Sequence, residues 1–453
     1  MKAAKNGYIH SGFALVLVAA ASLLVASLIT ACETLTVDFV YVASAKAAGT
    51  NNYGEIDVFE INSESGKMRQ IPTSPFPSGG RDPVAEAISA DNENLFVANQ
   101  DDNTIVQFAI GIDGKLYPNY TVNTPGIYPL AIAANKSNVF VVDTYQPLPQ
   151  CSTADPCSGS IAVFPLTAGN SSTCSTSVCL GPAATNSAIG WQYWPLLLSG
   201  ANSSHVIVPT AVNVLKSGSY VYVTTYDSSV SPTVGYIFAF WVVPSGTSST
   251  SPATIPSGIT CPAPTAGGTP TSVTTIDSPG TLCPLNSPPF AAGVQPSAIA
   301  SDSTSAYVYV TDYASSNVRG YTVGSSGALT ALSGSPFQAG NQPTAVVVDP
   351  SYPYAYVANY TDDTVTAYSI SGGVLTRIGS YATGLQPVAM GIDPSTNHFL
   401  YTANFLANTV SGFELSTTDG TLLDSQFSPY TTNAQPVAVA AIPHNGVGGG
   451  VQQ

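Results

Sequence analysis

The stretch YVANYTDDTVTAY, residues 356–368, joins two runs of β-branched and aromatic residues through a short polar segment. Two such runs separated by a few small polar residues predict the strands and the turn of a β-hairpin. The adjacent carboxylates Asp362 and Asp363 allow a second interpretation, an acid pair for catalysis or metal binding. The choice depends on whether the stretch occurs only once in the chain.

The pattern recurs three times without gaps. The copies are FVANQDDNTIVQF (96–108), YVTDYASSNVRGY (309–321) and YTANFLANTVSGF (401–413). More divergent copies begin at Tyr41, Phe140 and Tyr222, which makes seven in all. Internal repeats of about 40–50 residues are typical of propellers and solenoids.

Two further elements recur in phase with this hairpin. An apolar strand opened by proline precedes it, as in QPTAVVVDP from Gln342 and QPVAMGIDP from Gln386. Another strand follows it, often with a Ser-Pro-aromatic group such as Ser335-Pro336-Phe337. Each unit therefore supplies four short strands, which is the content of one propeller blade. The sequence predicts an all-β fold, a seven-bladed β-propeller of four-stranded blades.

The two ends of the repeat region complement each other. Residues 37–44 have the pattern of a second strand, whereas residues 435–442 have the pattern of a first strand. We expect the C-terminal strand to pair with the N-terminal strands in one shared blade, because a ring closed in this way leaves no open sheet edge. A stacked solenoid would not need such ends.

The first residues have the features of an export signal. A short basic region precedes the apolar run 13–29, which leads into LITAC at 28–32. This segment resembles the lipobox of bacterial lipoproteins, which implies a signal peptide over 1–31, lipid on the sulfur of Cys32 and a lipidated linker over 32–36. An ordinary secretory signal or a signal anchor is the alternative. In every case we expect an exported protein, on the periplasmic or cell-surface side of a membrane.

The composition excludes one class of partner. Without the signal, nine basic residues stand against 26 acidic residues, a formal charge of −17. Nucleic acids and anionic lipid surfaces are bound through clustered Lys and Arg, so neither is expected as a partner. The lipid on Cys32 is the expected contact with the membrane.

Six cysteines remain when Cys32 is assigned to lipid. They are Cys151, Cys157, Cys174, Cys179, Cys261 and Cys283. Six cysteines allow 15 pairings, of which pairing between sequence neighbours is the simplest prediction. A metal site with C-x5-C and C-x4-C spacing is the alternative, but thiols in exported proteins tend to oxidise. We therefore expect disulfides, and no metal or other cofactor.

The cysteines lie in stretched repeat units. We place the propeller at 37–443, with inserts at about 144–159, 167–209 and 243–292, and a flexible tail at 444–453. The inserts are rich in Ser, Thr and Pro. Either they cap one face of the ring and carry function, as surface loops often do, or they are tolerated decoration without a partner.

Alignment of the four clean copies bears on the acid pair. The fourth position always has a side chain that can start a turn; its residues are Asn99, Asp312, Asn359 and Asn404. The position of Asp362 is occupied by Ser315 and Ala407 in two sister copies. An acid that its sister copies lack fits a turn better than a catalytic site. Asp362 and Asp363 are therefore predicted to be turn residues on the rim.

Few other residues offer chemistry. The chain has no G-x-S-x-G, H-E-x-x-H or Walker motif, and we interpret His205, His398 and His444 as structural or solvated. Arg81 comes just before a proline-led strand, where it would face the channel mouth and bind an anion or a carbonyl oxygen. The alternative for Arg81 is a surface ion pair with Asp82 or another neighbour.

The motifs YVTDY, YVANY and YTANF, which follow proline-led strands, resemble those of the lactonase-like seven-bladed propellers and the related YVTN repeat proteins. The resemblance covers nearly all of the chain after the signal. It implies the propeller fold and, among characterised members, sugar-lactone hydrolases such as 6-phosphogluconolactonase and a cycloisomerase that forms a muconolactone. The His, Glu and Arg side chains associated with that cycloisomerase have no matching positions here.

Two hypotheses for function follow. The first is a monomeric, lipid-anchored propeller that acts as a scaffold and binds an envelope protein or a small molecule. The second is a sugar-lactone hydrolase in which Asp143 or Asp312 activates water and Arg81 polarises the carbonyl group. We rank the scaffold first, because a phosphorylated cytoplasmic sugar lactone is a poor substrate for an exported and strongly acidic protein.

Overall fold

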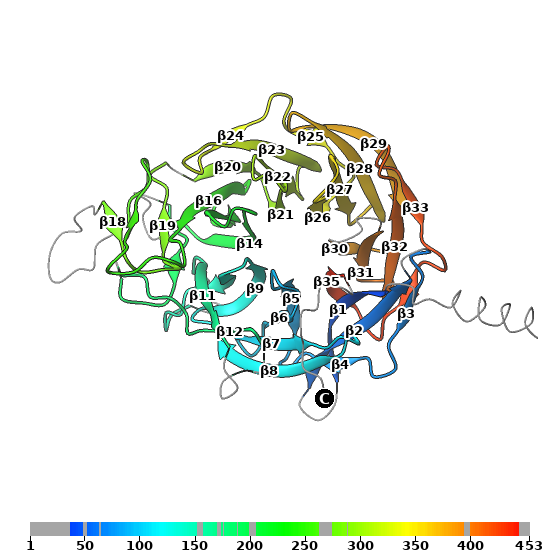
Figure 1. Cartoon of the computed structure of the whole chain (residues 1–453). Coiled ribbons are helices and arrows are strands. Elements are labelled where there is room, and N and C mark those ends of the chain that lie inside the picture. The colour runs from blue at the N-terminus through cyan, green and yellow to red at the C-terminus, as the bar shows by residue number, and fades with distance from the viewer. Residues whose placement is uncertain are drawn as a thin grey trace, which may run out of the picture.

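The computed structural model describes residues 37–48, 52–62, 65–151, 157–169, 174, 176–187, 189–198, 205–261, 274–287, 289–393 and 399–443. These residues form a ring of seven antiparallel sheets, each built on a path of four strands (Figure 1). The described residues contain no helix, and hence none that could cross a membrane. The predicted seven-bladed β-propeller is confirmed. The signal peptide, Cys32, the linker, His398 and the tail lie outside the described residues.

We number the blades in chain order, with blade one at the N-terminus. The innermost strands surround the centre of the ring in Figure 1 and are β5 (Pro83–Ile88), β9 (Ile127–Ala134), β14 (Ile207–Val214), β21 (Pro296–Ser301), β26 (Pro343–Val348), β30 (Pro387–Ile392) and β35 (Pro436–Ile442). The second strands are β1 (Val37–Ala48), β6 (Asn94–Asn99), β10 (Asn138–Tyr145), β15 (Tyr220–Asp227), β22 (Tyr307–Asp312), β27 (Tyr354–Asn359) and β31 (Phe399–Asn404). Each innermost strand is an edge of its sheet, where the missing N–H of a proline is tolerated. This proline opens five of the strands and is the third residue of β9 and β14.

The outer half of each blade is less regular. The third strands are β2 (Tyr53–Asn62), β7 (Thr104–Ile110), β11 (Ser160–Ala168), β16 (Val234–Val242), β23 (Asn317–Val323), β28 (Thr364–Ser371) and β32 (Thr409–Leu415). The outer strand is continuous in blades two and six, as β8 (Leu116–Asn123) and β29 (Val374–Ala382). In the other blades it is split into β3 (Met68–Gln70) and β4 (Phe76–Pro77), β12 (Val178–Leu180) and β13 (Trp194–Pro195), β19 (Leu282–Pro284) and β20 (Phe290–Gly293), β24 (Leu329–Ala331) and β25 (Phe337–Gln338), and β33 (Leu422–Asp424) and β34 (Tyr430–Thr431).

The ring is closed by the C-terminal strand. β35 pairs antiparallel with β1, so that Phe39 lies opposite Ile442 and Val42 lies opposite Val439. Blade one therefore has the order β3-β2-β1-β35, as the complementary ends of the repeat region predicted. Its innermost strand comes from the opposite end of the chain, which locks the first and last parts of the sequence together.

The first tyrosine of the repeat links neighbouring blades. Tyr41, Tyr222, Tyr309 and Tyr356 are fully buried, and each hydroxyl donates to the carbonyl of a glycine in the next blade. These glycines, Gly114, Gly327, Gly373 and Gly420, all have positive φ and pack against an aromatic ring of the preceding blade. A side chain there would collide with that ring and would be strained in the backbone conformation that the turn requires.

The hairpin of residues 356–368 carries no free acid pair. Asp362 accepts the backbone N–H of Asn341 at 2.7 Å, in the segment that leads into the same blade. Asp363, with φ of 52°, accepts the N–H of Gln386 at 2.7 Å, in the segment that leads into the next blade. Both turn residues therefore bond the hairpin to neighbouring segments, and Asp363 joins blade six to blade seven.

The cysteines pair with their sequence neighbours, as the simplest pairing predicted. The disulfides are Cys151–Cys157, Cys174–Cys179 and Cys261–Cys283. The first lies in the connection between β10 and β11 of blade three. The other two lie in the outer extensions of blades three and four, together with the small sheet of β17 (Ala253–Thr254) and β18 (Thr275–Ile276). Three disulfides in one chain indicate an oxidising, exported location.

Candidate functional site

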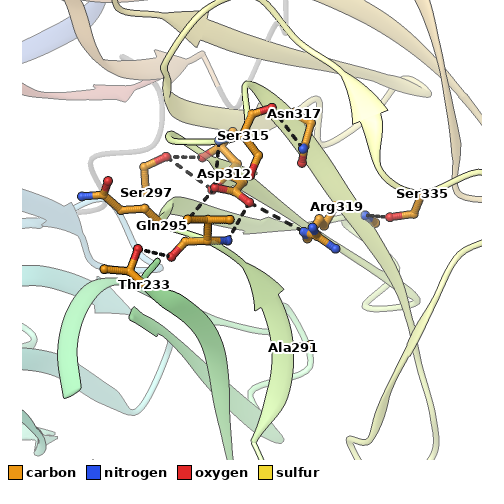
Figure 2. Close-up of polar contacts among 12 residues, drawn as sticks. Thr233, Ala291, Gln295, Ser297, Asp312, Ser315, Asn317, Arg319 and Ser335 are labelled. Carbon is orange, nitrogen blue, oxygen red and sulfur yellow. Dashed lines mark hydrogen bonds and ion pairs between the residues drawn. The ribbon is translucent and has the colours of Figure 1, made fainter. Parts of the chain in front are cut away.

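Asp312, a predicted catalytic carboxylate, lies buried at the end of β22 (Figure 2). Its Oδ2 atom accepts the N–H of Val294 at 2.9 Å, and its Oδ1 atom accepts the N–H of Gln295 at 3.0 Å. The Nε atom of Arg319 lies 3.8 Å from Oδ2. All these partners belong to blade five or to the segment that leads into it. Asp312 therefore fixes the start of β21 against the hairpin, and both of its oxygens are already bonded.

Asp143, the second predicted carboxylate, has the equivalent position in blade three. It is buried, and its Oδ2 atom accepts the N–H of Gly126 at 3.2 Å. Burial raises the pKa of Asp143 to about 7, although the Thr124 hydroxyl and the Gly126 amide act in the opposite direction. Its Oδ1 atom has no hydrogen-bond partner within the described part of the chain. Asp143 holds a proton more strongly than an ordinary aspartic acid, but it is shielded from solvent.

Arg81 forms a surface ion pair. Its Nε atom donates to Oδ1 of Asp102 at 2.7 Å, and its backbone N–H donates to Oδ2 of the same residue at 2.8 Å. The side chain is half exposed, and its bond to Asp102 raises the pKa of the guanidinium further. The partner is Asp102, in the hairpin of blade two, rather than the adjacent Asp82. Arg81, Asp143 and Asp312 thus belong to three different blades, and their contacts do not bring them together.

A different pair of side chains meets at the start of blade four. His205 precedes β14, and Asp227 is the last residue of β15. The pairing of Ile207 with Asp227 brings them side by side, with 2.5 Å between Nδ1 of His205 and Oδ2 of Asp227. The His205 side chain is 35% exposed, whereas that of Asp227 is 1% exposed. A buried carboxylate therefore orients a histidine that solvent can reach.

The surroundings of Asp227 keep it ionised. Burial raises its pKa, but the hydrogen bonds from the Ser229 hydroxyl, His205 and the Ser229 amide together lower that pKa below its ordinary value. The Ser229 N–H donates to Oδ1 of Asp227 at 3.0 Å, so the second oxygen is occupied as well. Because an ionised carboxylate can only accept, Nδ1 of His205 must carry the proton in this bond. In the neutral form of the imidazole, Nε2 is then the acceptor.

The backbone of His205 is also held in place. Its carbonyl accepts a bond from the hydroxyl of Ser158, and that hydroxyl in turn accepts the N–H of Ile207. Ser158 follows Cys157, so the disulfide with Cys151 anchors the segment that supports the histidine. Our interpretation of His205 from sequence, structural or solvated, missed this arrangement. The available signal was the repeat register, which places the segment before Pro209 opposite the end of the next strand.

The described residues contain no group of three or more side chains suited to hold a metal ion. The site offers a histidine with one ring nitrogen fixed by a buried carboxylate. Such an arrangement suits general base catalysis when the imidazole is neutral.

Comparison with known proteins agrees with the fold. The model of the family "Lactonase, 7-bladed beta-propeller" matches residues 49–147 and 329–440. No match was found among curated proteins. The predicted resemblance to lactonase-like propellers is therefore confirmed at the level of the family model and the fold.

Solved structures cover almost the whole ring. A candidate 6-phosphogluconolactonase from Bacteroides fragilis has a TM-score of 0.62 at 17% identity, over 90% of this chain and 99% of that one. A candidate 6-phosphogluconolactonase from Bacteroides uniformis has a TM-score of 0.61 at 17% identity, with the same coverage of 90% and 99%. The periplasmic gluconolactonase of Pseudomonas aeruginosa has a TM-score of 0.59 at 14% identity, also over 90% and 99%. At these identities the likeness shows the fold alone.

Proposed function

We propose that this lactonase-like seven-bladed β-propeller is an exported hydrolase of uncharged sugar lactones, with His205 as the general base. The observation that carries the proposal is the 2.5 Å contact between Nδ1 of His205 and the buried carboxylate of Asp227. The family model and the lactonase names of the similar structures support the same reaction class. His205 and Asp227 replace Asp143, Asp312 and Arg81 as the proposed catalytic residues. The contacts of those three residues hold strands and turns of the blades together.

The proposed reaction needs one water molecule and no cofactor. Nε2 of His205 takes a proton from water while the water oxygen attacks the lactone carbonyl. Asp227 stabilises the imidazolium that forms and holds its ring in one orientation. The tetrahedral intermediate then collapses, the bond between the carbonyl carbon and the ring oxygen breaks, and the proton on Nε2 passes to the leaving alkoxide. The product is the open hydroxy acid.

The charge of the protein supports an uncharged substrate. The formal charge without the signal is −17, and no Lys or Arg is found bonded to His205 or Asp227 in the described structure. A phosphorylated lactone would be repelled at long range, whereas a neutral aldonolactone would not. An exported location fits the same choice, and one similar structure is named as a periplasmic gluconolactonase.

The test is the hydrolysis of gluconolactone by purified protein. The rate of acid release is measured and compared with the rate in buffer alone. Loss of a general base typically lowers the rate by about 10²–10⁴-fold, so His205→Gln should fall in this range. Asp227→Asn should also lose activity, because an amide cannot favour the same tautomer and stabilise the imidazolium. Lys216→Ala, an exposed change in the same blade, is the matched control and should retain the wild-type rate.

Two results would contradict the proposal. No turnover above buffer by the wild-type protein, with gluconolactone or with other neutral sugar lactones, would reject the hydrolase. Turnover that His205→Gln leaves unchanged, with an unchanged melting temperature, would reject His205 as the general base. The first result would favour the scaffold hypothesis, for which the exposed apolar side chains of the blade-three insert provide a surface. These are Trp191, Leu197 and Ile189, with exposures of 58%, 54% and 41%.

Lipid anchoring at Cys32 is the remaining part of the proposal. The apolar run and the LITAC segment support it. We expect a membrane-bound mature protein whose N-terminal residue is a diacylated Cys32, and Cys32→Ser should release it from the membrane fraction. Mass spectrometry of the N-terminal peptide checks this, and an unmodified cysteine in that peptide would contradict it.

A further inference from the structure

The outer strand of blade four leaves a cavity beside the third strand. β19 pairs with β16 at Phe240–Val242, and β20 pairs with β16 at Gly235–Ile237. Between these two contacts, Phe238 and Ala239 have no partner strand on the outer side. The insert of blade three lies against this gap, because Trp194 and Leu196 pack in one cluster with Phe238 and Phe240.

This cavity has the size and lining of a small-molecule site. Its volume is about 490 Å³, within the range of pockets that hold drug-sized ligands. The walls are mainly aromatic, aliphatic and proline side chains, and Asn186, Asn286 and Ser287 are the polar residues. None of the lining residues is charged. An ionised ligand would lose its hydration without gaining a counter-charge, so the pocket selects against charge.

One backbone N–H at the cavity corresponds to an N–H that is bonded to a serine in other blades. In blades one, five and seven, the serine of the Ser-Pro-aromatic group accepts an N–H from the gap in the third strand. These bonds run from Val58 to Ser74, from Gly320 to Ser335 and from Gly412 to Ser428, with lengths of 2.8, 3.0 and 3.0 Å.

Ala239 has the corresponding place in blade four. Its carbonyl accepts the N–H of Leu285, just as the carbonyl of Gly320 accepts the N–H of Leu332. This shared bond fixes the register, so the N–H of Ala239 points toward the cavity like that of Gly320 toward Ser335. No serine hydroxyl of the described residues takes the place of Ser335 here. Ala239 is a lining residue, and its N–H is the donor that the cavity offers.

We infer that this cavity binds an uncharged small molecule with an apolar body and a hydrogen-bond acceptor that reaches the Ala239 N–H. The aromatic walls cover the apolar body, and the acceptor completes the bond that serine makes in the other blades. His205 and Asp227 are not among the lining residues. The inference is therefore separate from the proposed hydrolysis, and either one can fail without the other.

The experiment uses Nile red, an uncharged dye with a carbonyl acceptor whose fluorescence rises in apolar surroundings. We expect saturable binding of one dye per wild-type chain. Leu197→Asp places a charge at a lining residue that is 54% exposed, so the fold should tolerate it while the affinity falls at least tenfold. Leu423→Asp, at a residue that is 67% exposed in blade seven, is the matched control and should bind like the wild type.

Melting temperatures of both variants are measured first, because only folded variants can be compared. Ile189→Asp, at another lining residue that is 41% exposed, repeats the test and should show the same loss. Absence of saturable binding to the wild type would overturn the inference. So would equal affinity of Leu197→Asp and Leu423→Asp, since the dye would then bind elsewhere on the surface.

Discussion

A chain that ends at Ala434, without β35, is expected to lose cooperative folding altogether. β35 contributes to two interblade cores at once: Ala440 and Ile442 pack toward blade two, and Val439 and Ala441 pack toward blade seven. Its removal also exposes the backbone of β1 over the whole paired stretch. Together these losses are comparable to the total stability of a domain, about 5–15 kcal/mol. Circular dichroism during heating should show no unfolding transition, and the chain should aggregate.

A transposed variant separates the strand from the closure that it provides. Residues 435–443 are moved in front of Val37 and joined to it through the turn sequence 349–353 of blade six. Blade one is then complete, with its strands in the usual chain order, but no strand bridges the two ends of the ring. This variant should unfold cooperatively at a lower temperature than the wild type. A truncated chain as stable as the full chain would contradict the role assigned to β35.

The fold was predictable because the same residue types recur at positions that make the same contacts in several blades. A buried tyrosine such as Tyr356 must place its hydroxyl near a carbonyl of the next blade, and the buried Asn359 must satisfy the segment that leads into its own blade. Asp363 combines a positive φ with a bond to the next blade, which small polar residues do best. The tyrosine contact recurs in four blades, through Tyr41, Tyr222, Tyr309 and Tyr356, so it remains visible in the sequence.

The candidate site was not predictable in the same way, because it occurs only once. Asp143 and Asp312 are acids in a repeated position, which suggested catalysis. In the structure, the side chain at this position accepts a backbone N–H. His205 and Asp227 lie side by side where β14 begins and β15 ends, and their residue types do not set them apart from other turn residues. Their meeting depends on the register of β14 and β15 and on the insert that places Ser158 under the histidine.

Glu86 departs from the residue type that the repeat has at its position. In the six other blades, the residue three positions after the proline of the innermost strand is apolar. Its sister residues are Ile132, Val212, Ile299, Val346, Met390 and Val439. Glu86 is partly exposed as a residue, but its Oε2 atom is buried and has no partner within the described structure. Its Oε1 atom accepts the N–H of Ala43, across the interface between blades two and one, at 3.2 Å.

Glu86→Gln is expected to stabilise the protein, and increasingly so as the pH rises. Burial raises the pKa of the Glu86 carboxyl to about 8, although the bond from Ala43 opposes the shift. The unfolded chain releases this proton near pH 4.5, so the carboxyl lowers the free energy of unfolding progressively from about pH 4.5 to about pH 8. Glutamine keeps an acceptor for Ala43 and never ionises. We expect a gain of roughly 2–4 kcal/mol at pH 8 and almost none at pH 4.5.

Two further variants separate charge from hydrogen bonding. Glu86→Met copies the residue of blade seven, removes the charge and also leaves the Ala43 N–H without its acceptor. Its gain at pH 8 should therefore be smaller than that of glutamine by about 1 kcal/mol, the usual worth of such a bond. Glu414→Gln, on the exposed side of β32, should leave the stability unchanged at both pH values. If urea unfolding of Glu86→Gln and wild type followed the same pH dependence, the Glu86 carboxyl would have to be solvated in the folded ring.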